Sequence, residues 1–326
     1  MLEQFGLAGN AVVLIAALLV LSRASNLTIN NAINLASATG LGKTKVGFIL
    51  VAFSTSLPEL FVAIFAVLAP ATVGITIGNV LGSNIANVCL ILGICLLVMA
   101  AKYPESAGFF TKMAREEVGS LNFGLLVASL VPLVLLFVGY SSQIVGVILI
   151  TIFAFNMYQL MKERKTVEEF SEDAEKKKTN IYVFLSILGA LGVVTCSYFI
   201  VESASFLALS AGIPTVVVGA TLVAFGTSVP ELATSLASVR KGFLDLALGN
   251  IVGSCFLNIT LILGVTFLAS PVQVELTAFS DVIIFSLIAN LVLWYILQNK
   301  RVNRRDGIFL LMIYAIFIAI SLGNAI

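Results

Sequence analysis

The 326-residue chain contains no histidine and little charge, since only 11% of its residues are Asp, Glu, Lys or Arg. The absence of histidine removes the commonest zinc and copper ligand and the commonest proton-relay side chain. We also find no plausible pairing of a nucleophile with a base and no nucleotide-binding loop, which disfavours an enzyme. No resident cofactor, nucleic-acid partner or obligatory protein partner is expected. The few cysteines show no metal-ligand spacing and are expected to be buried small hydrophobes: Cys89, Cys95, Cys196 and Cys255.

Hydrophobic residues make up 60% of the chain, and the mean hydropathy is +1.09. A soluble domain of this length could not keep so much apolar surface from water, so we expect an all-α polytopic membrane protein in a lipid bilayer. Apolar runs long enough to cross the membrane predict ten spans, at roughly 6–36, 44–69, 74–101, 118–139, 142–161, 180–210, 214–239, 243–270, 275–298 and 305–325.

Positive charge is distributed unevenly over the predicted connections. Every Lys and Arg except Arg23 falls between spans 1 and 2, 3 and 4, 5 and 6, 7 and 8, or 9 and 10. By the positive-inside rule these connections are cytoplasmic and both termini are extracellular. The longest charged connection, residues 162–179, is expected to be a solvated cytoplasmic linker. The cell membrane is the expected location.

Two phrases occur twice in the sequence. VGFILVAFSTSLPEL at 46–60 is matched by VGATLVAFGTSVPEL at 218–232, and GNVLGSNIANVCLILG at 78–93 by GNIVGSCFLNITLILG at 249–264. Each half therefore holds five predicted spans, an odd number, so the second half enters the membrane from the opposite side. The expected organisation is a first inverted repeat at 1–161, the linker at 162–179 and a second inverted repeat at 180–326, with a substrate site at the repeat interface.

Each copy of the first phrase places one glutamate, Glu59 or Glu231, inside a predicted span. A carboxylate at the centre of a membrane helix costs at least about 2.5–3.5 kcal/mol, which favours a bound cation as compensation. A proline precedes each glutamate and deprives the carbonyl four residues before it, at Ser54 or Gly226, of its helical partner. Carboxylates, hydroxyls and released carbonyls suit Ca²⁺, which takes 6–8 oxygens in irregular geometry, better than octahedral Mg²⁺.

The second phrase adds Ser83 with Asn87 in one half and Ser254 with Asn258 in the other, each pair four residues apart on one helical face. Neutral oxygens of this kind suit Na⁺. Two buried carboxylates carry a charge of about −2, which one Ca²⁺ or two Na⁺ can neutralise. If both ions need the same glutamates, they exclude one another, and rocking of the halves then produces antiport.

These phrases resemble the two α-repeats of the calcium/cation antiporter superfamily, and most closely the prokaryotic sodium/calcium exchangers. The resemblance implies ten helices, with long first and sixth helices sliding across a core of the other eight. It implies that Glu59 and Glu231 ligate Ca²⁺ beside the carbonyls of Thr55 and Thr227. It also implies sodium sites, with Asn87 and Asn258 flanking the central position, drawn from Ala52, Thr55, Ser56, Ser83, Ala224, Thr227, Ser228 and Ser254.

Two positions depart from the family pattern. Ser54 stands where glycine is usual, and Asn258 stands where some relatives, including potassium-dependent exchangers, have aspartate. Asparagine in both halves disfavours a potassium requirement and leaves the sodium stoichiometry open. Proton-coupled Ca²⁺ antiport is the alternative, although that branch resembles GNxxE rather than TSxPE at the glutamates. A cation channel with a glutamate constriction is a third reading, which the inverted repeats disfavour.

Overall fold

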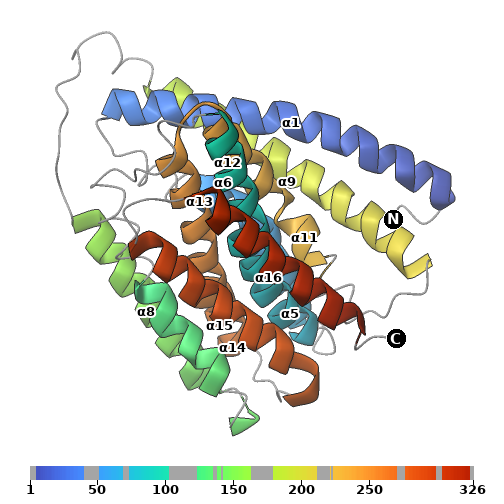
Figure 1. Cartoon of the computed structure of the whole chain (residues 1–326), viewed down its shortest axis with the longest axis vertical. Helices are drawn as coiled ribbons and strands as arrows, with labels where there is room; N and C mark the ends of the chain where they lie inside the picture. The colour runs from blue at the N-terminus through green and yellow to red at the C-terminus, as the bar shows by residue number, and fades with distance from the viewer. Residues whose placement is uncertain are drawn as a thin grey trace.

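We describe a computed structural model of the chain (Figure 1). The structure describes residues 5–39, 51–68, 73–102, 123–134, 138–140, 142–162, 179–210, 221, 223–269, 276–298 and 303–323. Most of the predicted linker, at 163–178, lies outside these residues, as do the first residues of the spans predicted at 44–69, 118–139 and 214–239. Within the described residues the regular secondary structure is helical, as expected from the composition.

Helices occur within every one of the predicted spans. The first half contains α1 (Gly6–Thr39), α3 (Phe53–Thr55), α4 (Leu57–Leu68), α5 (Val73–Ile85), η4 (Ala86–Leu92), α6 (Gly93–Lys102), a helix over Phe123–Val134, and α8 (Gln143–Lys162). The second half contains α9 (Thr179–Ser210), α11 (Ala224–Thr227), α12 (Val229–Arg240), α13 (Leu244–Leu257), η7 (Asn258–Ile262), α14 (Leu263–Ala269), α15 (Leu276–Gln298) and α16 (Arg304–Gly323).

Among the described residues, five helical stretches are both long and apolar enough to cross a membrane by themselves. They are Gly6–Ala32, Thr76–Lys102, Thr179–Cys196, Leu244–Ala269 and Ser280–Gln298. Two shorter apolar helices cover Phe123–Val134 and Gln143–Gln159. The chain is thus a polytopic helical membrane protein, while the count of ten crossings stays a prediction.

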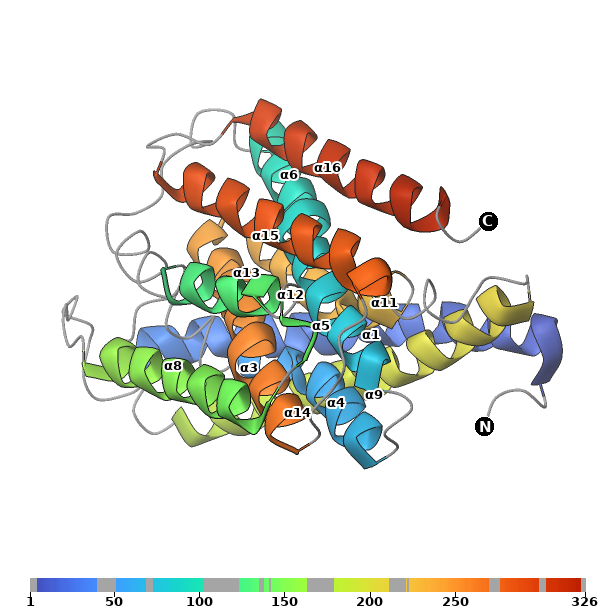
Figure 2. The ribbon, with the colours of Figure 1, turned by 90° about the horizontal axis from the view of Figure 1, so that it is seen from below.

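The long helices α1 and α9 run side by side along one face of the molecule (Figures 1 and 2). They pack on each other more extensively than any other pair of helices. At their crossing, a Cβ atom on Gly189 would lie 2.5 Å from the Thr28 hydroxyl oxygen and 2.8 Å from the Thr28 backbone nitrogen. Glycine is therefore required there for the two backbones to approach, a common arrangement in membrane helices.

The remaining helices surround two continuous helical rods, α5–η4–α6 and α13–η7–α14, which carry the second repeated phrase. Most of their side chains are buried, and they form the centre of the largest apolar cluster. The outer helix α16 crosses the first rod where Gly93 meets Gly307, and α8 crosses the second where Gly146 meets Gly264. The four cysteines are unpaired and buried, as predicted.

Each half contains the same two irregularities. The helix that carries the glutamate is interrupted at Ser56 or Ser228, where ψ falls to 6° or −1°. The rod beside it changes from α-helix to π-helix near the asparagine of the second phrase, in η4 and in η7. Short π-helical segments within α-helices are frequent at functional sites. Both irregularities therefore mark the repeated phrases as the region where a site is expected.

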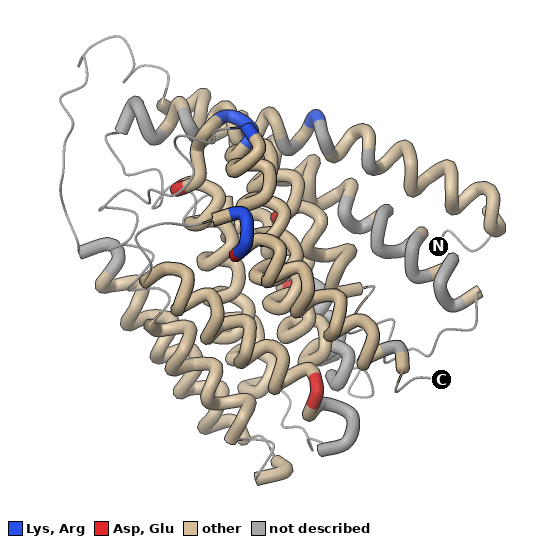
Figure 3. Tube along the Cα trace, in the orientation of Figure 1, with Lys and Arg blue, Asp and Glu red and all other residues tan. Residues whose placement is uncertain are grey.

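Charged residues are sparse in the described chain (Figure 3). Arg23 is exposed on α1, and the other basic residues lie near helix ends. Lys102 donates a 2.6 Å hydrogen bond to the carbonyl of Arg240 at the end of α12, and Lys241 donates to Asn30 on α1. In contrast to these basic residues, two acidic residues lie within the bundle. They are Glu59 and Glu231, both with 0% exposure.

Candidate ion-binding site

The two glutamates occupy matching places in opposite halves. Glu59 lies in the first turn of α4 and Glu231 in the first turn of α12, each directly after the interruption of its helix. The proline before each glutamate lacks a backbone N–H and has a fixed φ, which suits the start of a new helical segment. Both carboxylates are thereby held inside the bundle at the point where backbone regularity is broken.

Glu231 is held by hydroxyl groups from both halves. Its Oε1 atom accepts hydrogen bonds of 3.2 Å from Ser56 in the first half and 3.2 Å from Ser254 in the second. Among the described residues its other oxygen, Oε2, has no partner. The contact with Ser56 shows that the two glutamate phrases, far apart in sequence, meet in space.

Glu59 is in a different environment from Glu231. Within the described part of the chain neither of its carboxylate oxygens has a hydrogen-bond partner, and the hydroxyl of Ser228, which matches Ser56 in the repeat, has none either. A buried carboxylate without partners is strongly unfavourable unless a cation compensates it. Both oxygens of Glu59 are therefore candidate ligands for a positive ion.

The threonines before each interruption contact asparagines of the opposite half. The Thr55 hydroxyl lies 3.3 Å from Oδ1 of Asn250, and the Thr227 hydroxyl lies 3.1 Å from Oδ1 of Asn79. All four side chains are buried. The two contacts are reciprocal, because each joins the first phrase of one half to the second phrase of the other.

The alanine carbonyls predicted as sodium ligands already accept hydrogen bonds. The Ala52 carbonyl accepts from the Ser56 backbone at 3.0 Å and the Thr55 hydroxyl at 3.3 Å. The Ala224 carbonyl accepts from the Ser228 backbone at 3.1 Å and from the hydroxyls of Thr227 and Ser83 at 3.3 Å each. Ser83 also lies 3.2 Å from the Thr227 hydroxyl, so it joins the site across the two halves.

The expectation about released carbonyls concerns Gly226 in the second half. The sequence predicts that Pro230 leaves the Gly226 carbonyl without a helical partner. In the structure that carbonyl shares the backbone N–H of Ser228 with the Ala224 carbonyl, to which the same N–H bonds at 3.1 Å. The Gly226 carbonyl therefore has a shared contact within the interruption in place of a helical partner, and its second lone pair is available to a ligand.

Asn87 is the second residue of η4 and Asn258 is the first residue of η7, and the two asparagines differ in their contacts. In the described structure both amide atoms of Asn87 are without hydrogen-bond partners. Asn258 donates a 3.1 Å hydrogen bond from Nδ2 to Oδ1 of Asn84, and its own Oδ1 has no partner among the described residues. All three side chains have 0% exposure.

The sequence reasoning missed three asparagines that support the site. Asn79 and Asn250 accept hydrogen bonds from the threonines, and Asn84 contacts Asn258. Asn250 is anchored further, because its Nδ2 donates to Ser235 at 2.9 Å and to Thr234 at 3.0 Å. The available signal was that the asparagine after glycine occurs in both copies of the second phrase.

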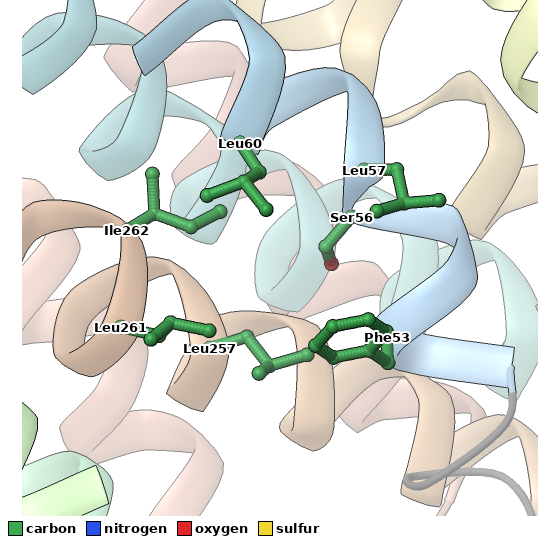
Figure 4. A pocket seen from close by; sticks show the side chains of 7 residues that line it. All are labelled: Phe53, Ser56, Leu57, Leu60, Leu257, Leu261 and Ile262. Atoms are coloured by element: carbon green, nitrogen blue, oxygen red, sulfur yellow. The ribbon is translucent and has the colours of Figure 1, made fainter. Parts of the chain in front are cut away.

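A small apolar pocket lies between the interrupted first-half helix and the second rod (Figure 4). Of its lining residues only Ser56 is polar, and the others are Phe53, Leu57, Leu60, Leu257, Leu261 and Ile262. Apart from the Ser56 hydroxyl, this lining offers no side-chain ligand for a cation. The described residues contain no cluster of three or more His, Cys, Asp and Glu, so the candidate ion site consists of the two glutamates with neutral oxygens around them.

Comparison with known proteins agrees with this geometry. Residues 9–162 and 181–323 match the family described as sodium/calcium exchanger protein. The sodium/calcium exchanger MaX1 of Methanosarcina acetivorans is 30% identical over 371 residues, covering 95% of this chain and 98% of the relative. The inner membrane protein YrbG of Escherichia coli is 29% identical over 318 residues, covering 93% and 94%.

Among solved structures, the sodium-calcium exchanger NCX_Mj soaked with Na⁺ and Sr²⁺ is similar, with a TM-score of 0.79 and 26% sequence identity. The similarity covers 95% of this chain and 97% of that one. The family match covers nearly the whole chain and includes both glutamate phrases. The chain therefore belongs to the sodium/calcium exchanger family.

Proposed function

We propose that this protein is a secondary active antiporter that exchanges Ca²⁺ for Na⁺ across a membrane by alternating access. The observation that carries the proposal is the pair of fully buried glutamates, one from each half, whose surroundings meet through the Ser56–Glu231 hydrogen bond. Membership of the exchanger family supports the same function. The family is one of transporters, and the chain is assigned no enzymatic role.

Calcium is held between the two glutamates in this proposal. The three carboxylate oxygens without described partners, both of Glu59 and Oε2 of Glu231, supply hard negative ligands. Backbone carbonyls near the interruptions, those of Thr55 and Thr227, add neutral oxygens toward the 6–8 that Ca²⁺ takes. The charge of the ion compensates the two buried carboxylates, which would otherwise disfavour closure of the site.

Sodium occupies the neutral oxygens that surround the same carboxylates. The hydroxyls of Ser56 and Ser254 donate to Glu231, and their lone pairs remain available to a cation on the opposite side. The proposed sodium ligands in the matching positions are Ser83 and Ser228. Because both ions need the charge of the same glutamates, Na⁺ binding displaces Ca²⁺.

The halves are proposed to be inverted repeats about a pseudo-two-fold axis in the membrane plane. The reciprocal contacts Thr55–Asn250 and Thr227–Asn79 support this symmetry, as do the matched helix interruptions. Such an arrangement places the substrate site where the repeats meet. We further propose that the protein lies in the cell membrane with both termini outside and residues 162–179 in the cytoplasm, on the basis of its loop charges.

Flux into liposomes tests the function. With Na⁺ loaded inside, we expect ⁴⁵Ca²⁺ uptake that requires the outward Na⁺ gradient and is unchanged when the pH gradient is collapsed. Uptake that follows the pH gradient and ignores Na⁺ would instead establish proton coupling. Single-channel currents far above the turnover of a carrier would show a channel and reject alternating access.

A further inference from the structure

Among the positions at which the two copies of the second phrase differ, one is buried and contacts the opposite half. After the shared glycine and serine, the first copy has Asn84 and the second has Cys255. Asn84 has 0% exposure and contacts the second rod with both ends of its amide. Its Nδ2 lies 3.2 Å from the Cys255 carbonyl oxygen, and its Oδ1 lies 3.1 Å from Nδ2 of Asn258.

These contacts determine the orientation of both amides. A backbone carbonyl only accepts hydrogen bonds, so Asn84 must present its Nδ2 to Cys255 and its Oδ1 to the other side. That oxygen also only accepts, so Asn258 must present its Nδ2 to Asn84. The Oδ1 atom of Asn258 is consequently turned away from Asn84, and it has no partner among the described residues.

Asn258 lies on the face of the second rod that contacts Glu231. Asn258 follows Ser254 by four residues, which places both side chains on one helical face. Ser254 donates to the Glu231 carboxylate at 3.2 Å. The orientation imposed by Asn84 therefore leaves a neutral oxygen without a described partner on a residue of the helical face that contacts Glu231.

We propose that Asn84 is a positioning residue that holds the Asn258 amide with its oxygen as an ion ligand. The proposal rests on the ion-exchange function proposed above. It specifies how the neutral amide of Asn258 is oriented within that site. The first half provides an internal contrast, because the residue that matches Asn84 is Cys255, whose thiol lies 4.0 Å from the Asn84 carbonyl oxygen and which has no amide to pair with that of Asn87. Both amide atoms of Asn87 are without partners in the described structure.

The test measures ⁴⁵Ca²⁺ binding and its displacement by Na⁺ on the purified full-length protein, so it does not depend on transport. In Asn84→Leu, which keeps the branched shape of the side chain and removes the amide, we expect both affinities to weaken about fivefold, the size of one lost hydrogen bond. Asn258→Ala should weaken them at least as much. The double variant should bind no more weakly than Asn258→Ala alone, because Asn84 acts through Asn258.

The matched control is Asn290→Leu. Asn290 is also fully buried and donates a 2.7 Å hydrogen bond to Ser129, but it lies on α15 outside the site. We expect this variant to lose thermal stability while its ion affinities stay within about twofold of wild type. If Asn84→Leu does not fold, Asn84→Cys replaces it in the comparison with Asn258→Ala and the double variant. That substitution installs the residue type found at the matching position, Cys255.

Effects of Asn84 and Asn258 that multiply in the double variant would overturn the proposal, and so would an Asn84 variant that folds and binds both ions normally. Failure of the proposed function is recognised separately. In that case the wild-type protein binds Ca²⁺ but, when reconstituted in liposomes, does not exchange it for Na⁺. In that case the binding cycle still decides the role of Asn84. A wild type that binds neither ion would reject both proposals.

Discussion

The two glutamates differ more in their surroundings than their nearly identical phrases suggest. Glu231 accepts hydrogen bonds from Ser56 and Ser254, whereas neither oxygen of Glu59 has a partner within the described structure. The supporting asparagines differ in the same sense. Asn250 is anchored by Thr234 and Ser235 of α12, while Nδ2 of Asn79, its counterpart in the first half, lacks a partner among the described residues.

The comparison indicates that one side of the site is organised by the protein and the other is organised by the ion. Hydrogen bonds fix the Glu231 carboxylate before any cation arrives, which reduces the ordering required on binding. Glu59 has no such bonds and gains its compensation from the bound cation. We therefore interpret the second half as the preformed wall of the site and the first half as the part that adapts.

The largest expected effect comes from removing either charge. Glu59→Gln and Glu231→Gln should each abolish Na⁺-dependent Ca²⁺ exchange, with a loss of more than about 100-fold, because breaking a buried charge interaction costs about 3–5 kcal/mol. Flux in liposomes measures this loss. Exchange above a few per cent of wild type in either variant would contradict the assignment of that glutamate.

The same two variants also test the difference between the glutamates. In ion-free buffer Glu59→Gln should raise the melting temperature more than Glu231→Gln, because only Glu59 lacks described hydrogen-bond partners. Both proteins must insert and purify as wild type for the comparison to be valid. An equal shift in the two variants would mean that the hydroxyls do little for Glu231.

Serine variants should produce the next largest effect. Ser56→Ala removes a hydrogen bond to the Glu231 carboxylate, and bonds to charged groups contribute about 1.5–3 kcal/mol, so we expect Ca²⁺ affinity to fall at least about tenfold. Ser228→Ala is the matched control, since its hydroxyl has no partner in the described structure. We expect Ser228→Ala to reduce Ca²⁺ affinity less, because only a direct contact with the ion can be lost there. A larger loss of Ca²⁺ affinity in Ser228→Ala than in Ser56→Ala would contradict the assignment of Ser56 as a support of Glu231.

A double substitution makes the second half resemble the first. Thr234→Val with Ser235→Ala installs the residue types found at Val62 and Ala63 and removes two hydrogen bonds from Asn250. Asn250 then holds Thr55 less firmly, and Ca²⁺ affinity should fall about fivefold. Binding of ⁴⁵Ca²⁺ to the purified protein measures this. Unchanged affinity in a protein of normal stability would show that the anchor is not part of the site.

The smallest expected effect concerns the asparagine without partners. Asn87→Ala should weaken Na⁺ dependence about threefold while leaving the melting temperature near that of wild type, because no described hydrogen bond is lost. The Na⁺ concentration for half-maximal exchange measures the effect. A large drop in stability with no change in Na⁺ dependence would assign Asn87 to packing rather than to ion binding.

The sequence predicted the helical class, helices within each apolar run and the convergence of the two glutamate phrases. Hydropathy is sufficient for the helical class and the helices, because these depend on residues close together in the chain. The convergence of the two phrases followed from their repetition in two halves of opposite orientation. The burial of Glu59 and Glu231, confirmed at 0% exposure, followed from their position within apolar runs.

Other features depend on packing between the halves and were not predicted. The contacts of Thr55 with Asn250 and of Asn84 with Asn258 join residues about 170–200 positions apart, and no local pattern indicates them. The repeat also suggested two equivalent half-sites. The inequality of Glu59 and Glu231 arises from packing, because the matched positions are all serines. Ser56 and Ser254 donate to Glu231, whereas Ser228 has no partner among the described residues and Ser83 contacts the Ala224 carbonyl and Thr227. The π-helical segments likewise gave no recognisable signal.

Competition between the two ions on the purified protein tests the central claim most directly. If both glutamates serve Ca²⁺ and Na⁺, rising Na⁺ should displace bound ⁴⁵Ca²⁺ completely, and Glu59→Gln or Glu231→Gln should remove the Ca²⁺ binding that Na⁺ competes for. Calcium that stays bound with unchanged affinity in saturating Na⁺ would contradict the account, because the ions would then occupy separate sites.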